Sequence, residues 1–141
     1  MVAVAVATPA AAASTDDVGA FVLAGSCGNA GISRPGFTVR SGSGGLPVDT
    51  TILITGRGVS SIGVFTATPG IATITPLSST ARLATLVSPL PAGSLLGLRT
   101  TLSTTTAFTL DARATLPEGY VGTGATSAAS VSSNEFVCAP G

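Results

Sequence analysis

The sequence predicts an all-β protein, a single antiparallel β-sandwich of immunoglobulin-like or jelly-roll type, with a small β-barrel as the alternative. Short segments rich in Val, Ile, Leu, Thr and Phe recur along the 141 residues, and turn residues separate them. The 18 glycines and 9 prolines recur too often for a ten-residue helical pattern to survive between them. The length suits one domain.

The chain divides into an N-terminal apolar arm or signal-peptide remnant, residues 1–14, and a sandwich domain, residues 15–141. In the arm, Val2, Val4 and Val6 alternate with alanines, which is the two-residue period of a β-strand. This alternation makes the arm a candidate assembly strand.

The same arm has features of a secretory signal. A helix-breaking Pro9 is followed by the small residues Ala11–Ala13 before Ser14, an arrangement typical of a cleavage site. No basic residue precedes the apolar stretch, which counts against a complete signal peptide. A disordered tail is the third interpretation.

The remaining strands follow from β-prone segments between turn signals. In chain order, the expected strands are Val18–Ala24, Gly36–Arg40, Thr50–Thr55, Ser61–Thr68, Ile71–Thr75, Thr80–Val87, Leu95–Leu102, Thr106–Leu116, Tyr120–Val121 and Ser130–Cys138. Turns are indicated by Pro69-Gly70, Pro89–Gly93 and Pro117–Gly119.

Alternation is clearest in the segment Phe108–Leu116. One face carries Phe108, Leu110, Ala112, Ala114 and Leu116, and the other carries Thr109, Asp111, Arg113 and Thr115. This pattern predicts a strand with one face on the core and one in water. Asp111 and Arg113 are neighbours on the outer face, where an ion pair contributes little to stability.

Cys27 and Cys138 are the only cysteines, and they lie near the two ends of the chain. We expect them to form one disulfide, with the half-cystine of Gly25–Gly28 in a tight turn; two buried free thiols are the alternative. Two cysteines without His cannot complete a zinc shell. A disulfide predicts an extracellular or cell-surface location.

The composition excludes several functions. His, Lys, Trp and Gln are absent, six arginines balance six acids, and only 9% of the residues are charged. Without His and Lys there is no Ser-His-Asp activation, imidazole shuttle, Schiff base or P-loop lysine. Zero net charge does not suit nucleic-acid binding, and no apolar run reaches the 18 residues of a membrane span. We expect no catalytic residue, cofactor or metal.

Other candidate sites are weaker. Asp16-Asp17 is the only adjacent carboxylate pair and lacks a calcium-loop pattern. The Gly-rich Ser41–Gly45 has no Walker lysine, and Gly56–Gly58 indicates a turn that needs positive φ. The threonine clusters lack the fixed Thr-x-Thr interval of an ice-binding face.

These observations favour a non-enzymatic extracellular structural protein that self-assembles with copies of itself into a filament, coat or shell, through its N-terminal strand. The alternative is a secreted monomeric binding module that recognises a ligand through the loops Ser41–Gly45, Gly56–Gly58 and Gly122–Gly124. An enzyme that uses carboxylates alone, such as Asp111 and Glu118, is the least favoured hypothesis.

Overall fold

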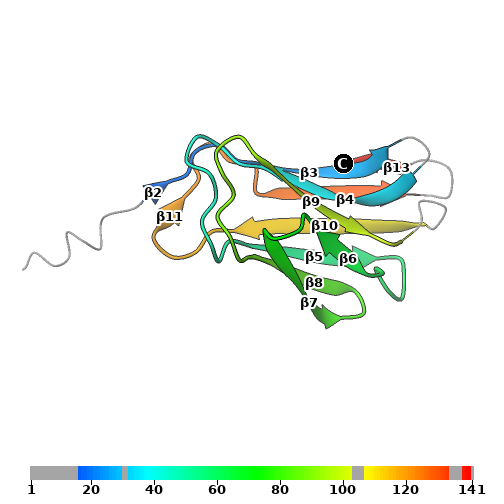
Figure 1. Ribbon diagram of the computed structural model, residues 1–141. Helices are drawn as coiled ribbons and strands as arrows, with labels where there is room; N and C mark the ends of the chain where they lie inside the picture. The colour runs from blue at the N-terminus through cyan, green and yellow to red at the C-terminus, as the bar shows by residue number, and fades with distance from the viewer. Residues whose placement is uncertain (1–15, 30–31, 103–106, 134–137, 141) are drawn as a thin grey trace, which may run out of the picture.

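The computed structural model describes residues 16–29, 32–102, 107–133 and 138–140, and throughout these ranges the chain forms strands and loops. Two antiparallel sheets pack face to face without closing into a barrel (Figure 1). The predicted all-β sandwich is therefore confirmed, and the barrel alternative is wrong. None of the described segments is a helix of the length and hydropathy needed to cross a membrane.

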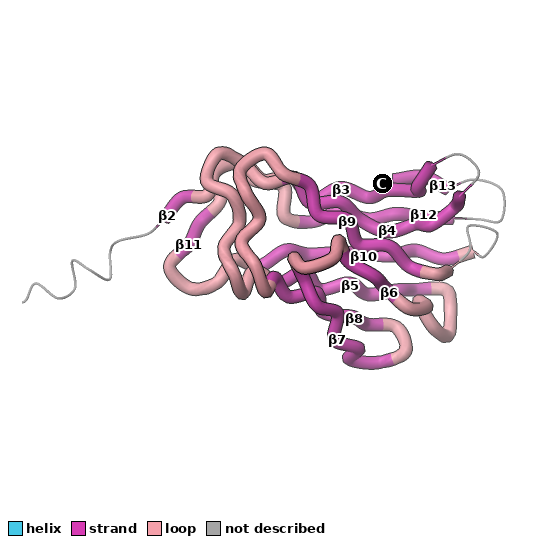
Figure 2. The backbone as a smooth tube through the Cα atoms, in the orientation of Figure 1, coloured by secondary structure: helices cyan, strands magenta, loops and turns pink. Residues whose placement is uncertain are grey.

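The strands are β2 (Asp16–Asp17), β3 (Val22–Asn29), β4 (Ile32–Arg40), β5 (Thr51–Arg57), β6 (Phe65–Ala67), β7 (Ala72–Ser78), β8 (Ala81–Leu86), β9 (Leu95–Thr100), β10 (Phe108–Thr115), β11 (Tyr120–Val121), β12 (Ala128–Ser133) and β13 (Cys138–Pro140). One sheet has six strands in the order β13-β12-β10-β5-β8-β7, and the other has four in the order β3-β4-β9-β6. β2 and β11 form a separate parallel pair at one end of the sandwich (Figure 2).

The core lies between the two sheets and consists of aliphatic side chains and four phenylalanines, Phe21, Phe37, Phe65 and Phe108. Alternate residues point inward, so that Ile52, Ile54 and Leu110 of the six-stranded sheet face Leu96 and Leu98 of the other sheet, and all five are fully buried. The predicted inward face of β10 is confirmed, since its residues alternate between buried and more exposed positions. Truncating one such Leu or Ile to Ala costs about 2–5 kcal/mol.

Covalent and backbone bonds fasten the two sheets along one side of the sandwich. The predicted disulfide is present between Cys27 of β3 and Cys138 of β13, whose Cα atoms are 5.9 Å apart. Further along the same side, Leu23 N donates to Thr126 O at 2.8 Å. A Cβ on Gly25 would lie 2.3 Å from Ser130 O, so this position needs glycine for the close approach of the two chains.

The predicted turns at two glycine-rich segments are wrong. Gly25–Gly28, expected as a tight turn, lies inside β3 and contains a shift in register between Ser26 and Gly28. Gly56 and Arg57 continue β5, and the turn begins only at Gly58, whose φ is +87°. In both cases packing against another strand holds glycines in extended conformation despite their weak strand propensity.

Candidate functional site

The outer surface of the six-stranded sheet carries an uncharged patch, which we call the threonine–leucine face. It consists of Thr73 and Thr75 on β7, Leu83 and Thr85 on β8, and Thr51 and Leu53 on β5. These side chains lie in two rows across the strands, because residues opposite each other in neighbouring strands point to the same face of the sheet. Neighbouring strands lie about 4.8 Å apart, so the rows are continuous.

The first row is made of threonines alone. Thr73 lies opposite Thr85, Thr85 opposite Thr51, and Thr51 opposite Thr115 of β10. The second row runs from Thr75 through Leu83 and Leu53 to Arg113. Because leucines occupy the middle of this second row, only the first row is an unbroken line of threonines, unlike the repeated array of an ice-binding surface.

The threonine–leucine face exposes apolar side chains to solvent. Leu53 is 39% exposed, and Val87, which follows β8, is 50% exposed. Charged groups border the face on the β10 side but do not enter it, the nearest in the register being Arg113 opposite Leu53. A weakly charged surface with exposed leucine and valine is typical of a surface that another chain covers.

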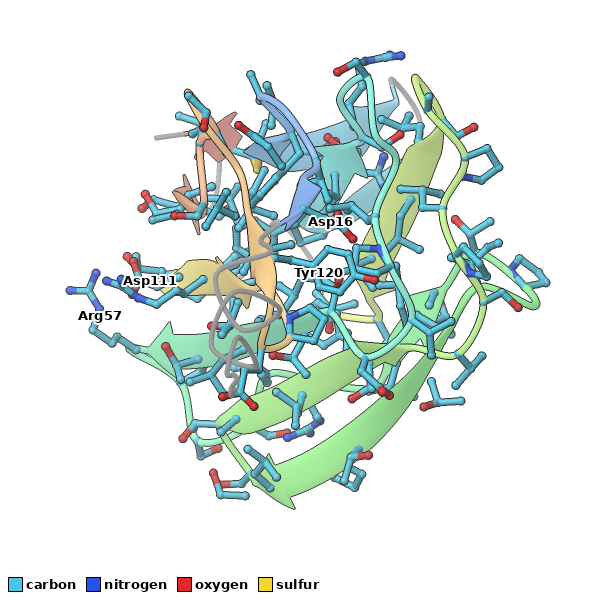
Figure 3. The ribbon with its side chains drawn as sticks, turned by 90° about the vertical axis from the view of Figure 1, so that its left-hand side faces the viewer. Asp16, Arg57, Asp111 and Tyr120 are labelled. Atoms are coloured by element: carbon cyan, nitrogen blue, oxygen red, sulfur yellow. A yellow bond between two sulfur atoms is a disulfide. The ribbon has the colours of Figure 1, made fainter. Side chains whose placement is uncertain are left out.

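The main ion pair of this sheet lies to one side of the face. Arg57 Nε donates to Asp111 Oδ2 at 3.0 Å, and the two side chains project together from the rim of the sandwich (Figure 3). The predicted pairing of Asp111 with Arg113 is therefore wrong: β10 and β5 align Thr109 with Arg57, which brings Arg57 diagonally next to Asp111. The Arg57 side chain is 70% exposed, so the pair adds little stability.

Asp17 has a structural role at the opposite end of the molecule. Its Oδ1 accepts hydrogen bonds from Gly19 N at 2.9 Å and Thr123 N at 3.0 Å, and its Oδ2 accepts one from the Thr123 hydroxyl. The hydrogen bonds from Thr123 and Gly19 hold the pKa of this carboxyl below its usual range. Among the described residues, no three His, Cys, Asp or Glu side chains gather as a metal site would require.

Two of the three predicted recognition loops are fastened to the body of the protein. In Ser41–Gly45, Gly44 N donates to Val18 O at 3.1 Å and Ser94 N donates to Ser41 Oγ at 3.0 Å. In Gly122–Gly124, Asp17 holds Thr123. These bonds hold both loops against neighbouring segments of the chain.

The third loop borders a pocket. A cavity of about 520 Å³ opens beside Arg57 and Gly58, and its wall includes the buried Phe108 together with Ala and Ser side chains. A cavity of this size lies within the range of small-molecule sites.

The predicted assembly residues Val2, Val4 and Val6 lie outside the described residues. The threonine–leucine face was not predicted from the sequence, although β5 contains an indication of it: Thr51 and Leu53 alternate with the buried Ile52 and Ile54. The alternation of one strand shows which side chains point outward, but not which strands lie beside it. The rows depend on the pairing of β5, β8 and β7, which no local pattern specifies.

The chain matches no protein-family model, and no curated protein matches it in sequence.

Proposed function

We propose that this protein is a non-enzymatic extracellular structural protein that assembles with copies of itself into a filament, coat or shell, with its N-terminal strand contributing to the contact. The observation that carries the proposal is the threonine–leucine face, an uncharged surface that extends over three adjacent strands and exposes Leu53. A soluble monomer usually keeps more charge on such a surface to prevent association.

Two further features support the proposal. The disulfide between Cys27 and Cys138 suits an oxidising compartment, as is typical of secreted proteins. The absence of His and Lys from the chain removes the most common acid–base and nucleophilic groups.

The experiment compares assembly of the full chain with that of two variants by sedimentation and electron microscopy. The first variant begins at Thr15 and lacks the alternating Val/Ala arm. The second, Leu53→Lys, places a charge in the middle of the threonine–leucine face. We expect the full chain to form large particles, and we expect each variant to need a concentration at least about tenfold higher.

Val64→Lys is the matched control for the charge substitution. Val64 is 65% exposed and lies between β5 and β6, outside the threonine–leucine face. This variant should assemble as the full chain does. A full chain that stays monomeric at high concentration would contradict the proposed function.

The pocket beside Arg57 supports a second candidate function, that of a secreted monomeric binding module. Its apolar wall and rim arginine would suit a small ligand with an apolar body and an anionic group. A stable monomer that binds decanoate, together with loss of that binding in Arg57→Ala, would favour this function over assembly.

A further inference from the structure

We propose that the free edge of β7 is the acceptor for the N-terminal strand of a second copy, residues 2–7, so that the copies join head to tail. This inference rests on the proposed assembly function and names the acceptor within it. Strand addition of this kind obtains its affinity from main-chain hydrogen bonds along an open sheet edge.

A comparison of the four sheet edges identifies β7 among the described strands. β13 has only three residues and is tied at Cys138 by the disulfide. β6 is also three residues long. The free side of β3 already bonds to Thr126 and packs against Ser130. β7 has seven residues and pairs with β8 alone, so it forms the long open edge of the six-stranded sheet (Figure 1).

The hydrogen-bond phase of β7 shows which of its backbone groups face outward. Opposite residues of an antiparallel pair alternate between hydrogen-bonded and non-bonded positions. Val87 N donates to Ile71 O at 2.8 Å, in the same register that places Ala72 opposite Leu86. Thr73 and Thr75 therefore bond to β8, whereas Ala72 and Ile74 direct their N–H and C=O groups to the free edge.

The free edge also has a defined end. Pro76 occupies the next outward position and has no N–H, and the register shifts between Pro76 and Ser78. The edge thus offers donors at Ala72 and Ile74 and then stops. Such an arrangement suits a short incoming strand and limits how far it can slide.

The side chains of β7 suit a strand that alternates Val with Ala. Ala72 and Ile74 point inward and pack against the core, but both remain partly exposed at the side of the sandwich. In a strand added beside them, Val2, Val4 and Val6 would share the inward face and extend the aliphatic layer. The alternate alanines would then continue the outer surface next to Thr73 and Thr75.

The placement of the two elements favours a second copy as the donor. β2 lies with β11 beyond one end of both sheets, whereas β7 runs along the far edge of the six-stranded sheet (Figures 1 and 2). Donor and acceptor are different surfaces of the chain, so the contact is heterologous when each copy donates its arm to one neighbour and accepts the arm of another. Repetition of such a contact produces a ring or an open filament.

The test measures assembly of Ala72→Pro, which removes an outward N–H at the first residue of a strand, a position that tolerates proline. We expect its critical concentration to rise at least about tenfold. Ala67→Pro is the control, because it removes an outward N–H from the edge strand β6 of the other sheet. Thr101 N donates to Val64 O at 3.0 Å, so Val64 and Thr66 bond to the neighbouring strand and the N–H of Ala67 points to the free edge. The control should assemble normally.

Cross-linking gives a second measurement that does not depend on proline tolerance. Oxidation of a mixture of the single variants Ala5→Cys and Thr73→Cys should produce covalent dimers, and Thr66→Cys, exposed on β6, should not replace Thr73→Cys. The two native cysteines are already bonded to each other.

Other outcomes would overturn the assignment. Suppose that removal of the arm abolishes assembly, but Ala72→Pro assembles normally and the Ala5→Cys and Thr73→Cys mixture forms no covalent dimers. In that case β7 is not the acceptor, although the assembly function stands. A monomeric cross-link within a chain that carries both cysteines would show that the arm binds its own sheet. A secreted protein whose first residue follows Ala13 would overturn donation altogether.

Discussion

At the scale of single residues, Asp17 illustrates how an exposed carboxylate can organise a loop. Its two oxygens accept hydrogen bonds from Gly19 and Thr123, residues more than 100 positions apart. Because the backbone of β2 also pairs with β11, Asp17 joins β2 to the Gly122–Gly124 loop at one end of the molecule.

Replacement of Asp17 by Asn should lower the melting temperature at neutral pH by about 2 °C, because the charged acceptor is lost. A carboxyl whose pKa is lowered on folding stabilises the protein above its unfolded pKa of about 3.9. This contribution disappears as the pH falls through the lower folded value. The difference between the two proteins in thermal unfolding should therefore narrow below about pH 4.

Asp16→Asn provides the charge-matched control, since it removes a carboxylate from the adjacent exposed position. It should leave the melting temperature at neutral pH nearly unchanged. An equal fall of the melting temperature in the two variants would show that net charge, rather than the bonds to Thr123, causes the effect.

At the scale of elements, two glycines of the four-stranded sheet make different demands on their strands. A Cβ on Gly36 of β4 would lie 1.9 Å from the backbone oxygen of Leu98, and neither strand can move without loss of pairing. A Cβ on Gly97 of β9 would approach only Thr68 Oγ1, at 3.7 Å.

Gly36→Ala should therefore destabilise the protein by about 2 kcal/mol or more. Gly97→Ala should change stability by only about 0.5 kcal/mol, because the site is open and alanine restricts the unfolded chain. Chemical denaturation of both variants measures the difference. Similar losses in the two would mean that β4 and β9 adjust to one another more freely than their register indicates.

Elements that show a local pattern could be predicted from the sequence, whereas elements that depend on distant partners could not. Alternation located β10 and the inward Phe108, Leu110 and Ala112, because period-two burial is a local pattern. It failed at Gly25–Gly28, where contact with Ser130 and the disulfide keep the segment extended. The parallel pair of β2 with β11 joins residues about a hundred positions apart, which no local pattern shows.

At the scale of the whole molecule, the charged side chains that the structure describes are distributed unequally. The carboxylates Asp16, Asp17, Asp49 and Glu118 lie in β2 or in the loops at the same end of the sandwich, because the start of β5 lies opposite the end of β10 and β2 pairs with β11. Figure 3 views the molecule from this end and labels Asp16. Arg57, Arg82 and Arg99 lie near the opposite ends of their strands, where Arg57 pairs with Asp111, whereas Arg40 at the end of β4 lies at the acidic end. The threonine–leucine face lies between these two charged regions.

The salt dependence of assembly distinguishes uncharged contacts from contacts between the oppositely charged ends of the molecule. Assembly through the threonine–leucine face and the β7 edge involves few charges, so raising the salt from about 50 mM to about 500 mM should change the critical concentration by only about twofold. Sulfate should strengthen assembly by favouring apolar burial. Light scattering across a salt series measures both effects. A steep weakening with sodium chloride would indicate contact between the acidic and arginine-containing ends instead.

The disulfide determines how the chain responds to a proteolytic cut. Because Cys27 and Cys138 are 111 positions apart, their bond closes nearly the whole sandwich into one ring, with the N-terminal segment as a free branch. A protease that cuts once inside this ring opens it but releases no fragment, and the surrounding strands keep the cut ends in register. Only reduction or a second cut separates the pieces, so a single nick damages this fold far less than it would a linear chain.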